Sequence, residues 1–177
     1  MWIMKVKIFI YTLCILFIVL VQSTILEYVK IYNIKPNLLI IFVICVAFLR
    51  GSTEGTIIGF FAGLLQDMLF GTMLGFYALL GMYLGLIVGM VNKRLYRENL
   101  LIIVFFTFVS TIIYETCVFI FTSLNIVISG QVSLLFPFGK VILPEAIYNS
   151  LISVFVYIFV IKLNFKFEEA DRSVRKY

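Results

Sequence analysis

Long apolar runs alternate with short polar or charged links along the whole chain. Hydropathy and the helix breakers in the links predict six transmembrane helices, at residues 8–26, 37–49, 55–70, 74–91, 100–124 and 141–161. The pattern therefore predicts an all-α integral membrane protein, a compact six-transmembrane-helix bundle that forms a single domain over residues 1–177. The tail from Lys162 onward mixes both signs of charge, which is typical of a solvated end.

The second and third predicted helices are short for a membrane-spanning role, with 13 and 16 residues. A helix that crosses the hydrocarbon core needs about 20 residues. Either these two helices extend into their flanks, or the pair is partly re-entrant. We expect extension, with a tight turn over residues 50–54 and with Arg50 reaching the membrane interface along its aliphatic stem.

Composition strengthens the membrane interpretation. Hydrophobic residues make up 63% of the chain and charged residues 13%, whereas a soluble domain is about half apolar and a quarter charged. The excess is too large for one globular core of this size, so lipid must cover it. The apolar stretch 8–26 is longer than a signal-peptide core, so we expect an uncleaved first helix.

The placement of Lys and Arg predicts the orientation in the membrane. If both termini are cytoplasmic, only Lys30, Lys35 and Lys140 of the 14 cationic residues lie outside. The other eleven then lie inside, as the positive-inside rule expects, and an even number of spans follows. The cluster Lys93, Arg94 and Arg97 either determines this topology only, or also binds anionic lipid head groups or a partner protein.

No set of residues suited to catalysis is present in the sequence. The chain has no His, the commonest acid–base catalyst and metal ligand. Cys14, Cys45 and Cys117 each lie inside an apolar run, which is typical of small buried hydrophobes. We therefore expect a protein that is not an enzyme and has no catalytic residues, no cofactor, no metal and no nucleic-acid partner.

Glycines recur at every fourth position in the third and fourth predicted helices. Small residues at this spacing let helix backbones approach closely in lipid, where little hydrophobic force drives association. We expect these two helices to pack closely, against each other or against a partner protein. The candidate packing residues are Gly55, Gly59, Gly63, Asp67, Gly71, Gly75, Gly81, Gly85 and Gly89.

Ionisable and amide side chains also lie inside the predicted spans. Glu115 lies roughly 14 Å from the outer end of its helix, where an ionised side chain costs at least about 2.5 kcal/mol. It must therefore be paired, protonated or exposed to a wet cavity. We expect a buried polar network in the outer half of the bundle, formed by Gln22, Asp67, Glu115, Glu145 and Asn149. Such a network could fix helix register only, form a docking or ligand pocket, or serve as a proton or ion path.

Several segments carry a resemblance to a known family. They are Val-Gln-Ser at 21–23, Lys-Pro-Asn-Leu-Leu at 35–39, the glycine-rich run 55–75 that contains Asp67, and Asn149. On these residues the chain resembles the MreD family, the rod shape-determining membrane proteins of bacteria. The residue after the proline is often Asp in that family and is Asn37 here, so a carboxylate at this position is not essential in this protein.

The resemblance implies a non-enzymatic scaffold subunit of the cell-shape and wall-elongation machinery in the bacterial plasma membrane. The partners it implies are, foremost, an MreC-like protein and, in the wider complex, RodA, a class B penicillin-binding protein, the MreB filament and membrane lipids. It also implies a bundle similar to the substrate-binding components of energy-coupling-factor transporters.

Two functions from different classes compete. A scaffold accounts for the glycine series and the missing catalytic groups. A substrate-binding subunit of an energy-coupling-factor transporter accounts for the polar cluster. Such subunits often carry small residues at spacing four in the first helix, and residues 8–26 contain neither Ala nor Gly. This favours the scaffold, and an intramembrane enzyme is disfavoured by the missing His.

Overall fold

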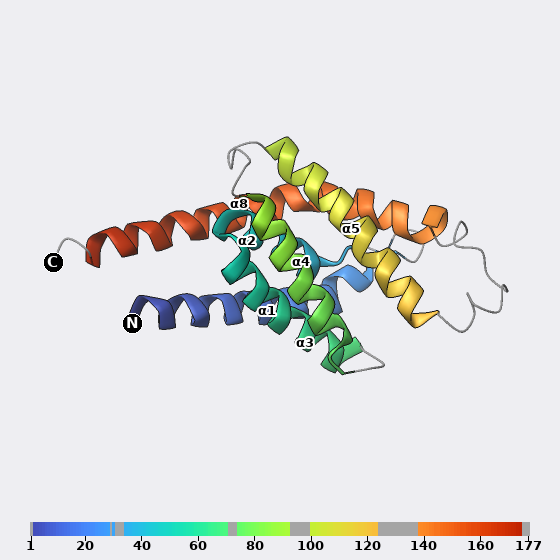
Figure 1. Ribbon diagram of the computed structural model, residues 1–177, viewed down its shortest axis with the longest axis horizontal. Coiled ribbons are helices and arrows are strands. Elements are labelled where there is room, and N and C mark those ends of the chain that lie inside the picture. The colour runs from blue at the N-terminus through green and yellow to red at the C-terminus, as the bar shows by residue number, and fades with distance from the viewer. Residues whose placement is uncertain are drawn as a thin grey trace.

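The computed structural model describes residues 2–28, 30, 34–70, 74–92, 100–123 and 138–174. Over these ranges the chain is helical, with six α-helices (Figure 1). They are α1 (Trp2–Tyr28), α2 (Leu38–Arg50), α3 (Ser52–Phe70), α4 (Phe76–Asn92), α5 (Leu100–Thr122) and α8 (Leu143–Val174), with a short π-helical turn, η1 (Phe138–Ile142), before α8. The all-α prediction is therefore confirmed.

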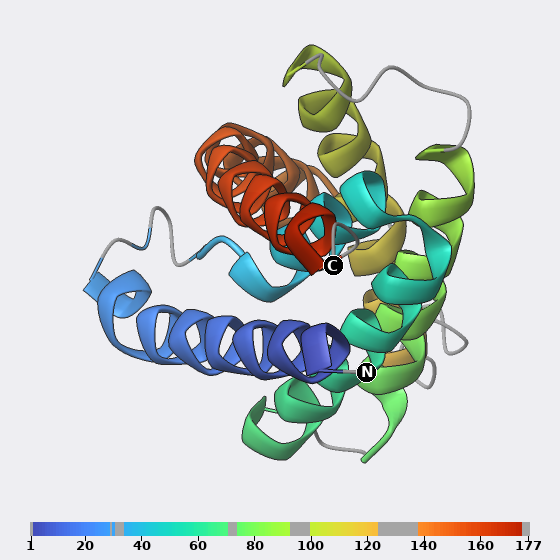
Figure 2. The ribbon, with the colours of Figure 1, turned by 90° about the vertical axis from the view of Figure 1, so that its left-hand side faces the viewer.

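The short helix α2 is the centre of the bundle. Every residue from Leu39 to Leu49 is buried, and α2 contacts each of the other five α-helices. A helix that is apolar on all sides must be covered on all sides. Figure 2 shows the arrangement from the end where the termini lie, with α1 and α8 on one side of α2 and with α3 and α4 on the other.

The expected extension of the second helix is wrong. The helix α2 has 13 residues, a length of about 20 Å. Protein rather than lipid surrounds it, so it has no need to match the thickness of the bilayer. The third helix does extend, to 19 residues, because it begins at Ser52.

A single glycine makes the turn between α2 and α3, in place of the predicted turn over residues 50–54. Gly51 has φ +91°, a conformation that side chains disfavour. Its N–H donates to the carbonyl of Ala47 at 2.9 Å and so closes the end of α2. The chain reverses direction at this one residue, so α3 already begins at Ser52. Glu54 therefore lies in the first turn of α3.

Three segments are long and apolar enough to cross a membrane: Phe9–Leu26 in α1, Leu100–Thr122 in α5, and Phe138–Glu169 over η1 and α8. Each exposes large apolar side chains, for example Phe17 at 65%, Leu101 at 76% and Phe155 at 75%. Such surfaces are covered by lipid or by a partner. The helices α2 and α4 are apolar but shorter.

The N-terminal part of α1 and the C-terminal part of α8 project together beyond the rest of the bundle (Figure 1). The helix α8 has 32 residues, about 48 Å, and continues through most of the tail that the sequence predicted to be a solvated end. Phe167 in this tail is buried, and its ring lies 5.5 Å from the ring of Tyr11. The tail is therefore helical, and its first part is packed.

Candidate functional site

The glycine series of α3 and α4 face each other. A Cβ atom on Gly59 would overlap the carbonyl group of Gly81, and a Cβ atom on Gly81 would overlap the carbonyl oxygen of Gly59. The same close approach joins Gly55 to Gly85, Gly63 to Tyr77 and Ala78, and Gly89 to Ser52. The two backbones therefore touch along the whole seam, and side chains are absent from the contact. Gly71 lies outside the described residues.

Asp67 closes the far end of this seam by capping α4. Its Oδ1 accepts a hydrogen bond from the N–H of Tyr77 at 2.9 Å, and its Oδ2 accepts from Gly75 and Ala78 at 3.0 and 2.9 Å. The first N–H groups of a helix have no partner within the helix, and their dipoles favour a negative charge. Gly75 has φ +98°, which lets the chain turn into α4. The buried carboxylate is thus fully engaged by α4.

Asn149 ties α8 to α2 and α5. Its side chain is fully buried, and its Oδ1 accepts from the backbone N–H of Asn37 at 2.9 Å. Its Nδ2 donates to Oγ1 of Thr111 at 3.3 Å. The Asn37 side chain in turn caps α2 by accepting from the N–H of Ile40 at 3.4 Å. Asn149 therefore holds the beginning of α2 between two other helices.

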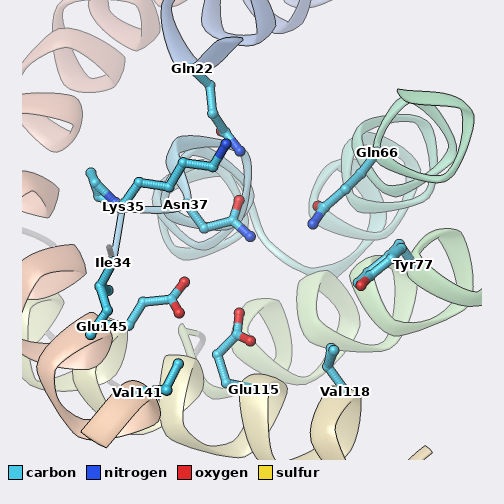
Figure 3. A pocket seen from close by; sticks show the side chains of 11 residues that line it. Gln22, Ile34, Lys35, Asn37, Gln66, Tyr77, Glu115, Val118, Val141 and Glu145 are labelled. Atoms are coloured by element: carbon cyan, nitrogen blue, oxygen red, sulfur yellow. The ribbon is translucent and has the colours of Figure 1, made fainter. Parts of the chain in front are cut away.

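A cavity of about 310 Å³ lies next to this junction. Figure 3 shows that Gln22 from α1, Gln66 from α3, Glu115 from α5 and Glu145 from α8 all point into it. The carboxyl groups of Glu115 and Glu145 lie on neighbouring sides of this space. The remaining lining residues are Ile34, Lys35, Pro36, Asn37, Tyr77, Val118 and Val141.

The structure divides the predicted polar network into separate groups. Gln22, Glu115 and Glu145 come together in the cavity. Asp67 is engaged at the beginning of α4, and Asn149 at the beginning of α2.

Four residues that line the cavity were not predicted from the sequence as site residues: Lys35, Asn37, Gln66 and Tyr77. A signal existed for Asn37, since an amide residue between a proline and an apolar run is a typical helix N-cap. Gln66 is an amide in an otherwise apolar helix and could have been found in the same way as Gln22.

A second polar cluster lies where α2 and α3 meet near the ends of α1 and α8. Nε of Arg50 is 3.1 Å from Oε2 of Glu54, and the hydroxyl of Tyr11 donates to the same oxygen at 3.3 Å. The guanidinium of Arg50 lies 5.7 Å from the centre of the Phe167 ring. The Arg50 side chain is only 12% exposed. Arg50 is therefore packed against Glu54 and Phe167, and its position at the membrane interface stays a prediction.

The described residues contain no group of three or more His, Cys, Asp or Glu side chains that could hold a metal ion. Cys14, Cys45 and Cys117 are free thiols. The cavity therefore presents carboxyl and amide side chains around a small space.

The fold and the cavity define an all-helical integral membrane protein with a polar recess between its helices. The family model of the rod shape-determining protein MreD matches residues 4–167. This match covers most of the chain, which therefore belongs to the MreD family. Neither a curated protein nor a solved structure matches the chain, so the similarity to energy-coupling-factor components stays a prediction.

Proposed function

We propose that this protein is a non-enzymatic scaffold subunit of the bacterial cell-shape and wall-elongation complex. The observation that carries the proposal is the family match over residues 4–167, which implies a role in rod shape determination. A scaffold must keep its shape while partners bind to it. The buried helix α2 and the glycine seam between α3 and α4 give such a rigid centre.

The partner proposed first is an MreC-like protein, and RodA, a class B penicillin-binding protein and the MreB filament belong to the wider complex. The glycines of α3 and α4 pack against each other. Their seam is therefore not available to a partner, and we place partner contacts on the outward faces of the helices. These faces carry large exposed apolar side chains that can bind a transmembrane helix.

The proposed orientation has six crossings and both termini in the cytoplasm. Two observations support it. The beginning of α1 and the end of α8 lie at the same end of the bundle (Figure 1), as an even number of crossings requires. Lys7 of α1 and Arg50 of α2 both lie over the ring of Phe167 in α8, so cations of two helices gather at that end, in agreement with the positive-inside rule. The cluster 93–97 lies outside the described residues.

The test is a pull-down of the tagged chain from its native membrane in mild detergent, with the bound proteins identified. We expect MreC-like and RodA-like proteins, and an unrelated tagged membrane protein of similar size serves as the control. Recovery of the ATPases and the transmembrane subunit of a transporter would overturn the proposal. A fluorescent protein fused to the C-terminus, which folds well only in the cytoplasm, should be bright if the orientation is right.

A further inference from the structure

Polar side chains from α1, α3, α4, α5 and α8 converge on the cavity. Figure 3 shows the amide of Gln22 above the space, Gln66 and Tyr77 on the right, and the carboxyl groups of Glu115 and Glu145 below and to the left. Ionisable and polar groups inside a membrane protein are unfavourable, and they commonly mark a functional site. Their convergence on one small space therefore points to a polar molecule that binds there.

Gln22 supplies an independent observation that points to a ligand. Its side chain is only 5% exposed, and it points into the cavity from α1 (Figure 3). Its Oε1 is buried and has no hydrogen-bond partner among the residues that the structure describes. A network that only fixed the helices would satisfy this oxygen, because a buried acceptor without a donor is unfavourable. A donor that enters the cavity would satisfy it.

The charges around the cavity favour a neutral ligand. The carboxyls of Glu115 and Glu145 and the ammonium of Lys35 line the same space, so groups of both signs are already present there. An added cation would meet Lys35, and an added anion would meet the glutamates. Either ion would also lose its hydration on entry, which is unfavourable. A neutral polar molecule avoids both losses.

We propose that this cavity binds a neutral ligand with several hydroxyl groups, in the form of a single sugar ring. Each hydroxyl both donates and accepts hydrogen bonds. The cavity offers acceptors in the two glutamates and in Oε1 of Gln22, and donors in the amide of Gln66 and the hydroxyl of Tyr77. One ring with hydroxyls around its rim meets groups of both kinds on several sides of the space. This binding site does not rest on the scaffold role.

The size and the apolar wall of the cavity limit the ligand further. A volume of about 310 Å³ is at the lower end of the range for ligand pockets, which suits one ring rather than a chain of rings. Val118 and Val141 form part of the wall, and the carbon face of a ring gains by packing against them. The ring can come from the head group of a glycolipid or from a free sugar.

The experiment compares two lipids that differ only at the sugar hydroxyls. The full chain is purified and delipidated in a detergent without a sugar head group. It is then incubated with equal amounts of glucosyl diacylglycerol and of the same lipid with every sugar hydroxyl methylated. Methylation keeps the ring but removes every donor, so native mass spectrometry should show about tenfold preference for the unmethylated lipid. In a second arm, free methyl glucoside should raise the thermal unfolding temperature, whereas its fully methylated form should not.

Variants connect the preference to the cavity. Gln22→Leu nearly preserves volume but removes the amide, and should reduce the preference several-fold. Exclusion of the methylated lipid by its bulk alone would survive this change. Asn164→Leu is the matched control, because Asn164 of α8 also has a buried amide oxygen without a partner among the described residues but does not line the cavity. If Gln22→Leu does not fold, Gln66→Leu changes another wall of the same cavity and should also reduce the preference several-fold.

Two results support the site and separate its sources. Selective retention of glucosyl diacylglycerol assigns it to a lipid head group, and a response to free methyl glucoside without lipid preference assigns it to a soluble sugar. The proposal is overturned if neither probe binds, which would leave the cavity to water, or if the methylated and unmethylated forms bind equally. It is also overturned if the preference survives in the cavity variants. None of these results depends on which proteins the pull-down recovers.

Discussion

The two long helix pairs of this protein meet in opposite ways. Between α3 and α4, glycines bring backbone against backbone, and Asp67 at the end of the seam has three hydrogen-bond donors. Beside α5 and α8, polar side chains from several helices surround a cavity that contains two glutamates. The first pair is in direct backbone contact, whereas the second borders a cavity with ionisable side chains.

This difference indicates that the α3–α4 seam contributes stability and that the cavity carries groups available for binding. Close backbone packing gains dispersion contacts along the full length of a seam and fixes one geometry. A polar recess gives up such contacts and retains groups that bind something else, as functional sites commonly do at the expense of stability. We therefore expect substitutions in the α3–α4 seam to destabilise the protein, and substitutions of the cavity carboxyls to leave it as stable as before or more so.

The largest effect should come from Gly59→Ala. The added methyl group overlaps the carbonyl group of Gly81, so the two backbones must move apart over several turns. We expect a loss of about 3 kcal/mol or more in the free energy of unfolding, measured by reversible unfolding in mixed detergent micelles. Gly139→Ala is the matched control, because a methyl group there meets nothing within 4 Å. Equal stability of the two variants would contradict the close backbone contact between α3 and α4.

The second largest effect should come from Asp67→Ala. The change leaves the N–H groups of Gly75, Tyr77 and Ala78 without their acceptor. Loss of hydrogen bonds to a charged group should lower the free energy of unfolding by about 2–3 kcal/mol, and Asp67→Asn should lose less because it keeps one oxygen. Glu169→Ala is the control, since Glu169 is exposed and exposed charges contribute about 1 kcal/mol or less.

A smaller loss is expected for Asn149→Leu. The substitution nearly preserves volume but removes the acceptor for the N–H of Asn37, which is 7% exposed. A buried donor left without a partner costs about 1–3 kcal/mol, so the thermal unfolding temperature should fall clearly. Ser153→Ala, one turn further along α8, removes only a bond to the carbonyl of Ser150 in the same helix and should change little. An unchanged unfolding temperature in Asn149→Leu would show that α2 is held in another way.

The seam was predictable from the sequence, whereas the cavity was predictable only in part, because three of its lining residues, Gln22, Glu115 and Glu145, were expected to meet. A spacing of four between glycines is a local property, and it indicates close packing whatever the partner helix is. The cavity depends on residues from α1, α3, α5 and α8 meeting in space, and no local pattern encodes that meeting. Asp67 illustrates the limit, because its polarity marked it as a network candidate, whereas its partners are backbone groups of α4.

The length of α2 was misjudged for a related reason. Its residues are apolar on every side, and composition does not distinguish a surface covered by lipid from one covered by protein. The expectation that it would extend followed from assuming lipid. The mixed charges of the tail likewise predict a solvated end. In the structure, however, Phe167 in this tail packs against Tyr11 near the other end of the chain.

The smallest expected effect has the opposite sign and separates the two helix pairs most clearly. Glu115→Gln replaces a carboxyl in the cavity with a neutral amide of the same shape. An ionised carboxylate inside a membrane protein is unfavourable unless it is paired, whereas the amide carries no charge. We expect the protein to gain about 1 kcal/mol in the free energy of unfolding, measured in mixed detergent micelles.

The measurement should place Glu115→Gln beside Asp67→Asn, since both change a buried carboxyl to an amide in a membrane helix. Asp67 accepts three backbone N–H groups, whereas the carboxyl of Glu115 has another carboxyl as its neighbour. The same chemical change should therefore destabilise the protein at the seam and stabilise it at the cavity. If both variants lost stability to the same extent, the glutamate pair would be a structural element like Asp67, and the contrast between a sealed seam and an open recess would disappear.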